Sequence, residues 1–220
     1  MTNIWDLKYA AGDSLNKYPW DKIVSFVYRY YPRDQPKNET KILELGFGSG
    51  CNLWFCAREG FDCYGIEWSE IAVNHAKDWF LKENLNANLK QGNFSPLNFE
   101  SDFFDLIIDR GSLTCVNIND CFSSLKEVFR VLKPGGYFCF NPYSSQHTSH
   151  IEGDSLNSGM TKINTGTLVN VGDLKFYSEG EITKIVREAG FKIHQMRHIE
   201  EKFFSTKEGT QAEWFLVLGK

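Results

Sequence analysis

The chain has 220 residues, of which 42% are hydrophobic and 15% aromatic, and its formal net charge is −4 at pH 7. This composition suits one globular α/β domain with its own core, and the scattered basic residues disfavour nucleic acid as a partner. The apolar runs are far shorter than the roughly 20 residues of a membrane-spanning helix, and the N-terminus lacks an export-signal pattern. We therefore expect a soluble cytoplasmic protein without a membrane span, either a monomer or a homodimer.

Six cysteines occur without any CxxC pair, and several lie inside apolar patterns. A reduced thiol behaves there as a small hydrophobic side chain. We interpret them as core thiols and expect no metal site.

The first 40 residues are predicted to form a helical cap segment that precedes the main domain, residues 41–220. Ile23, Phe26, Val27 and Tyr30 follow helical spacing, and Pro32 ends the pattern. Residues 33–40 are polar and predict a short linker.

Strand and helix patterns alternate from Lys41 onward. Strands are predicted at 42–45, 61–67, 87–91, 104–109 and 137–141, and helices at 52–59, 69–85 and 120–132. A capping box beginning at Ser178 predicts another helix, closed by Gly190, and strands follow at 191–199 and 214–218. This alternation is typical of parallel βαβ units in an α/β fold.

A less regular insertion, residues 142–177, is rich in Ser, Thr, Asn, Gly and His. We predict a hairpin around 168–176 within it. Insertions of this kind often shape a substrate site.

The most informative feature is the segment ILELGFGSG, residues 42–50, in which an apolar strand stops at Glu44 and is followed by three glycines. Such a turn lets the backbone approach a ligand at the carboxyl edge of a sheet, which indicates a nucleotide-like cofactor. A dinucleotide fingerprint needs its third glycine at position 51, which is Cys51 here. Glu67 ends the second strand, where it can accept hydrogen bonds from ribose hydroxyls, and Trp68 either contacts an adenine or packs in the core. The pattern favours adenosine without pyrophosphate, with an NAD-dependent enzyme as the alternative.

These segments resemble the class I S-adenosylmethionine-dependent methyltransferases over roughly residues 41–200. The similarity continues in GIEWS, FDLIIDRGSL, LKEVFRVLKPGGYF and FYSEGEITKIVREAGF. The resemblance implies a Rossmann-like, seven-stranded, mostly parallel sheet with helices on both faces. It also implies a transferase that uses S-adenosylmethionine and releases S-adenosylhomocysteine.

Carried over by position, the resemblance implies a set of cofactor contacts. Glu44 would lie near the methionine amino group, Glu67 at the ribose, Asn93 at the adenine amine, and Asp109 at the methionine end. The implied cofactor-binding residues are Glu44, Gly46, Phe47, Gly48, Gly50, Glu67, Trp68, Asn93, Phe94 and Asp109. In similar enzymes the segment before the core folds over the cofactor, so Tyr9, Tyr18 and Trp20 either cover it or are ordinary core or surface aromatics.

The acceptor is predicted to be a small molecule methylated at a hydroxyl, and a sugar or glycan intermediate would suit the polar insertion. A hydroxyl must lose its proton, so a base is needed. The predicted catalytic residues are Asp109 and His147, and the predicted substrate residues are Arg110, Tyr143, His147 and His150. The alternatives are methylation of a protein or a small amine, and a non-catalytic module that binds S-adenosylmethionine.

Overall fold

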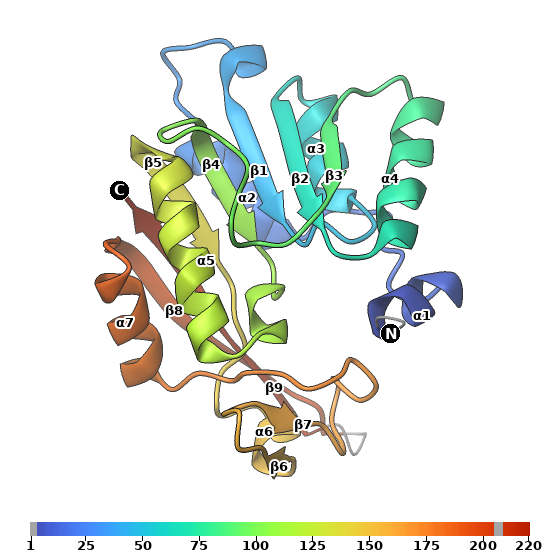
Figure 1. The fold of residues 1–220 in the computed structure, drawn as a ribbon, viewed down its shortest axis with the longest axis vertical. Coiled ribbons are helices and arrows are strands. Elements are labelled where there is room, and N and C mark those ends of the chain that lie inside the picture. Colours follow the sequence, from blue (N-terminus) through green and yellow to red (C-terminus); the bar gives the residue numbers. More distant parts are fainter. Residues whose placement is uncertain (1–3, 205–208) are drawn as a thin grey trace.

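The computed structural model describes residues 4–204 and 209–220. In this part of the chain, a seven-stranded sheet has the order β3-β2-β1-β4-β5-β9-β8 (Figure 1). The strands are β1 (Lys41–Leu45), β2 (Asp62–Glu67), β3 (Asn88–Gln91), β4 (Phe104–Asp109), β5 (Leu132–Phe140), β8 (Lys192–Lys202) and β9 (Thr210–Gly219). The first five strands are parallel, whereas β9 is antiparallel to both β5 and β8. The predicted fold class is confirmed.

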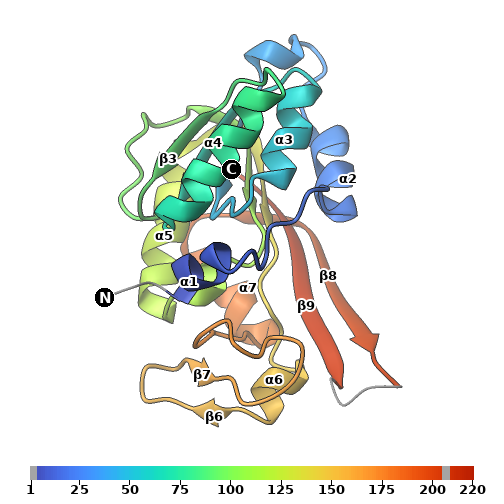
Figure 2. The ribbon, with the colours of Figure 1, turned by 90° about the vertical axis from the view of Figure 1, so that its right-hand side faces the viewer.

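Helices cover both faces of the sheet. On one face lie α2 (Asp21–Tyr30), α3 (Cys51–Arg58) and α4 (Glu70–Lys82), whose apolar residues share one core cluster with the strands. On the other face lie α5 (Ile118–Val131) and α7 (Glu179–Glu188), which pack into a second cluster (Figures 1 and 2). The central strands of the sheet are therefore buried between two apolar layers.

Strand order reverses between β1 and β4, and this reversal opens a crevice at their carboxyl ends. Leu45 is in register with Ile66 of β2 and with Asp109 of β4. The turn after β1 therefore lies between the residues that follow β2 and β4, which positions the site described below.

The N-terminal segment divides into two parts. The helix α2 lies on the sheet, while the short helix α1 (Ile4–Ala10) lies beyond the carboxyl ends of the strands, beside α4 (Figure 2). Asp6 and Ser69 form a side-chain hydrogen bond between α1 and the start of α4.

The insertion contains α6 (Thr148–Ile151) and a short hairpin of β6 (Asp154–Ser155) and β7 (Thr161–Lys162). The predicted hairpin at 168–176 is wrong, because only a single bridge joins Leu174 to Thr161. Leu168, Leu174 and Phe176 form a small buried cluster. Positive φ angles at Asn170 and Gly172 instead turn the chain within this segment, which interrupts an extended strand.

Two 3₁₀ turns, η1 (Lys37–Glu39) and η2 (Leu113–Cys115), complete the elements. The last two strands are longer than predicted and extend past the sheet as a two-stranded ribbon (Figure 2). No helix in residues 4–204 or 209–220 is both long and apolar enough to cross a bilayer.

Gly65, in the middle of β2, allows α3 and the turn after β1 to pack closely on the sheet. A Cβ at this position would lie 2.8 Å from Leu53 Cδ1 and closer still to the Phe47 ring. We expect Gly65→Ala to destabilise the protein by roughly 1–3 kcal/mol, because both buried side chains must move. Urea denaturation measures this loss. Gly180→Ala is the matched control, since nothing lies within 4 Å of its Cβ position, and equal stability of the two variants would contradict the packing role.

Candidate functional site

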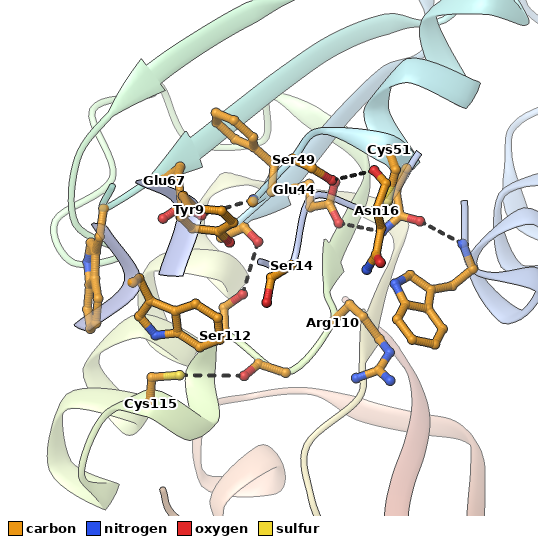
Figure 3. A pocket seen from close by; sticks show the side chains of 18 of the residues that line it. Tyr9, Ser14, Asn16, Glu44, Ser49, Cys51, Glu67, Arg110, Ser112 and Cys115 are labelled. Carbon is orange, nitrogen blue, oxygen red and sulfur yellow. Dashed lines mark hydrogen bonds between the residues drawn. The ribbon is translucent and has the colours of Figure 1, made fainter. Parts of the chain in front are cut away.

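A cavity of about 200 Å³ lies at the carboxyl ends of β1 and β4 (Figure 3). Four segments form its walls: the glycine turn after β1, the end of β2, the loop after β4, and the N-terminal segment with α1. The topology therefore gathers chain segments that are far apart in the sequence.

The glycine turn forms the floor of the cavity. Gly46 and Gly48 have φ angles of 61° and 53°, in the left-handed region that favours glycine. The Gly46 N–H donates to the Ile66 carbonyl at 2.7 Å, which ties the turn to β2. A Cβ on Gly48 would lie 2.7 Å from the Tyr9 hydroxyl, so the turn and α1 approach each other closely.

Glu67 connects the glycine turn to the end of β2. Its Oε2 accepts a hydrogen bond from the Gly48 N–H at 3.0 Å, and its Oε1 accepts one from the Ser69 N–H at 2.9 Å. Burial raises the pKa of this carboxyl above its usual value. Each oxygen has a further lone pair for a ligand donor.

Glu44, at the end of β1, is buried beside the same turn. Its Oε1 accepts a hydrogen bond from Asn52 Nδ2 at 2.7 Å, and Asn52 Oδ1 accepts one from the Trp20 N–H at 3.0 Å. Within the described residues, Glu44 Oε2 is buried without a hydrogen-bond partner. Burial raises the pKa of Glu44 to about 8. A buried, unpaired carboxylate oxygen suits a cationic or N–H ligand group.

Two aromatic rings form another wall. Trp68 and Phe94 are stacked, with ring centroids 5.2 Å apart and planes inclined by 13°. The Trp68 Nε1 donor is buried and has no acceptor in the part of the chain that the structure describes. Asn93 faces a second groove, of about 760 Å³, which shares Trp68 and Phe94 with the cavity. Residues of the insertion, including Met160 and Val171, also line this groove.

Asp109 lies behind the wall rather than in it. The side chain is fully buried, and its Oδ1 accepts hydrogen bonds from the N–H groups of Ser112 and Leu113 at 3.0 and 2.9 Å. Burial raises its pKa to about 7. These contacts fix the loop that carries Arg110 and Ser112 into the cavity wall.

The structure does not bring the two loop histidines to the cavity. His147 Nδ1 accepts the Ser149 N–H at 3.0 Å and caps α6, and burial lowers the pKa of its ring to about 4. The His150 ring lies 2.8 Å from Thr161 Oγ1 and stacks on Phe176. Tyr143 lies behind Gly111, outside the cavity wall.

Several wall residues were absent from the predicted site. They come from the N-terminal segment and from the loop after β4: Trp5, Tyr9, Ser14, Asn16, Ser112 and Cys115. Figure 3 shows the Tyr9 side chain beside Glu67. A seven-residue helix with little periodicity gives no sequence signal of where it will pack.

The strand order, the glycine turn and the acid at the end of β2 define a Rossmann-like protein with a nucleoside site. Residues 42–136 match the family model described as a methyltransferase domain. This match and the fold support the predicted resemblance to the class I S-adenosylmethionine-dependent methyltransferases. The cofactor of this family is S-adenosylmethionine.

Individual relatives agree with this assignment. The putative methyltransferase YqeM of Bacillus subtilis is 28% identical over 62% of this chain and 54% of its own length. The EEF1A lysine methyltransferase 2 of Danio rerio is 28% identical over 51% of this chain and 52% of its own length. The chain thus spans about half the length of these curated relatives.

Solved structures show the same fold over nearly the whole chain. An S-adenosylmethionine-dependent methyltransferase from Methanosarcina mazei aligns with a TM-score of 0.74 and 21% identity, covering 92% of this chain and 98% of the other.

The site residues fit S-adenosylmethionine in three respects. The backbone of the glycine turn lines the cavity, the unpaired Glu44 Oε2 suits an ammonium group, and the unpaired Trp68 Nε1 offers a donor at the aromatic wall. A carboxylate at Glu67 completes the arrangement.

Proposed function

We propose that this protein transfers a methyl group from S-adenosylmethionine to a small molecule in the cytoplasm. The arrangement of Glu44 and Glu67 on either side of the glycine turn, inside one cavity, is the observation that carries this proposal. The sulfonium group of the cofactor is the electrophile, so the protein has chiefly to orient the acceptor and exclude water. The six cysteines are all free, which suits a reducing compartment.

In this proposal, Glu67 accepts hydrogen bonds from the ribose and Glu44 pairs with the methionine amino group. The adenine lies against Trp68 and Phe94, with Asn93 at its edge in the adjoining groove. Residues 1–40 act as a cap, because α1 places Tyr9 against the glycine turn. Residues 41–220 form the catalytic domain, and the insertion at 142–177 contributes to the acceptor path.

The cavity wall favours an acceptor that ionises readily. In the described residues, the wall side chains apart from Glu44 and Glu67 include no base with a pKa near neutrality: burial raises the pKa of Cys51 to about 11 and that of Cys115 to about 12. A sugar hydroxyl would need such a base, whereas a thiol or phenol, with a pKa of about 8.5 or 10, is far more acidic. We therefore favour methylation at an acidic hydroxyl, with a thiol as the related case.

Protein lysine methylation is the alternative, and the Danio rerio relative's name supports it. A lysine ammonium would have to enter a cavity that also contains the Arg110 guanidinium. The lysine ammonium and the Arg110 guanidinium would repel each other, so the small-molecule function fits the site better.

The test is release of S-adenosylhomocysteine from S-adenosylmethionine in the presence of phenols, thiols, sugars and lysine peptides. We expect turnover with phenols or thiols and none with peptides. Thermal unfolding with S-adenosylhomocysteine and NAD is measured in parallel. Stabilisation by S-adenosylhomocysteine without turnover of any acceptor would instead support a non-catalytic module, and stabilisation by NAD alone would reject the family's cofactor for this chain.

Cofactor binding should release a proton near neutral pH. The pKa of Glu44 is about 8 because the side chain is buried, so the carboxyl is mostly protonated at pH 7 and must ionise to pair with the amino group. Without ligand, the folded state keeps a proton that the unfolded chain has lost, so stability should fall as pH rises from about 4.5 to about 8. Affinity for S-adenosylhomocysteine should rise over the upper part of this range.

Calorimetric titration in buffers of different ionisation enthalpy measures the proton release. Glu44→Gln, which cannot ionise, should bind without it. Identical heats for the native protein in all buffers would contradict the proposed contact.

A further inference from the structure

Arg110 is a basic residue in the wall of the cavity. It follows β4 directly, its side chain is only 13% exposed, and it lines the cavity. Figure 3 shows its guanidinium pointing away from the glycine turn and from Glu44. The cation is therefore directed away from the end of the cavity where Glu44 and Glu67 lie.

The protein's own carboxylates satisfy this guanidinium only in part. Arg110 Nη2 lies 3.4 Å from Glu213 Oε2, which is longer than the roughly 2.7–2.9 Å of a charge-assisted hydrogen bond. The other oxygen of Glu213 is already paired with Lys22 of α2. Glu213 Oε2 makes no hydrogen bond within the described residues.

The remaining neighbours of Arg110 do not remove its charge. The Trp20 ring centre lies 4.4 Å from the guanidinium carbon, and the Tyr143 hydroxyl is a neutral hydrogen-bond partner of Arg110. Asp109 uses Oδ1 to hold the backbone of its own loop. Arg110 and Lys22 together share one carboxylate, Glu213, so this group of charges behind the wall keeps a net positive charge when Asp109 is protonated.

A guanidinium presents N–H groups in a planar fork that matches the two oxygens of a carboxylate. Desolvation by the surrounding protein strengthens such a pair, and the Trp20 ring offers an apolar surface beside it. We propose that the methyl acceptor is a small molecule with a carboxylate group. Arg110 binds this carboxylate, and the apolar part of the acceptor packs on Trp20. This inference rests on the proposed function.

Benzoate and its neutral isostere benzamide are matched probes for this site. Their affinities are measured by calorimetry on the full chain saturated with S-adenosylhomocysteine. We expect benzoate to bind at least about tenfold more tightly than benzamide, as one charge-assisted pair allows. In Arg110→Met this preference should disappear, while affinity for S-adenosylhomocysteine stays within about threefold of the native value. The matched control is Arg187→Met, an exposed arginine on α7, which should keep the preference.

Three results would overturn the inference. One is equal binding, or no binding, of the two probes by the native complex, and another is a benzoate preference that survives in Arg110→Met. The third is a large loss of S-adenosylhomocysteine affinity in that variant, which would assign Arg110 to the cofactor's own carboxylate. Failure of the native protein to bind S-adenosylhomocysteine would instead reject the proposed function, so the two failures are distinguishable.

Discussion

Replacing Glu67 with alanine is expected to abolish measurable binding of S-adenosylhomocysteine. The carboxylate both holds the Gly48 N–H and, in the proposed function, accepts hydrogen bonds from the ribose hydroxyls. Each hydrogen bond to a charged group contributes roughly 1.5–3 kcal/mol, so losing two should weaken binding by about 100-fold or more. The thermal shift given by saturating ligand, normally a few degrees for a domain of this size, should vanish.

One further variant separates ribose binding from support of the turn, and a second serves as a control. Glu67→Gln keeps a carbonyl oxygen for the Gly48 N–H but loses the charge, so it should retain stability better than Glu67→Ala and still bind the ligand weakly. Glu70→Ala, an exposed acid in the first turn of α4, is the matched control. Native-like affinity in Glu67→Ala would refute the assignment of the ribose site to this residue.

The parallel part of the fold could be predicted because each of its elements has a local signal. The strands β1 and β4 are short, mainly apolar segments, and the predicted positions of the first four strands differ from the observed ones by at most one residue at an end. Glu67 could be located for the same reason, since it ends β2 in register beside the glycine turn.

Neither residue predicted as the base, Asp109 or His147, lines the cavity, because the position of such a side chain depends on tertiary packing. His147 follows the fifth strand, which suggested a place near the cofactor, but its ring nitrogen caps α6 and the residue is buried among insertion side chains. Asp109 ends the expected strand, yet its carboxylate binds its own loop. Hydrogen bonds of this kind depend on where a chain turns, and residue types alone do not fix that.

The sequence left open whether aromatic residues before the core cover the cofactor. In the structure Tyr9 lies close to the glycine turn, and Asp6 joins α1 to the start of α4. Arg110, by contrast, was predicted at the substrate side from its position after β4, and the structure places it in the wall.

Replacing Gly46 with alanine is expected to have an effect as large as that of Glu67→Ala, but by a different route. Its φ angle of 61° is strained for any residue with a Cβ, by roughly 1–2 kcal/mol. The new methyl group would also lie 2.5 Å from Ser112 Cβ and still closer to Ser112 Oγ. That hydroxyl donates to the carbonyls of Leu45 and Gly46 at 2.9 and 3.2 Å, so the clash would separate the turn from the loop after β4.

We therefore expect Gly46→Ala to lose roughly 2–4 kcal/mol of unfolding free energy, from strain and overpacking together, and to lose S-adenosylhomocysteine binding. Gly159→Ala isolates the strain, because Gly159 also has a positive φ, of 75°, but nothing lies within 4 Å of its Cβ position. Adding Ser112→Gly to Gly46→Ala removes the clash and should recover part of the stability, measured by urea denaturation. If Gly46→Ala destabilised the protein no more than Gly159→Ala and still bound the ligand, the close contact between this turn and the β4 loop would not be what shapes the cofactor cavity.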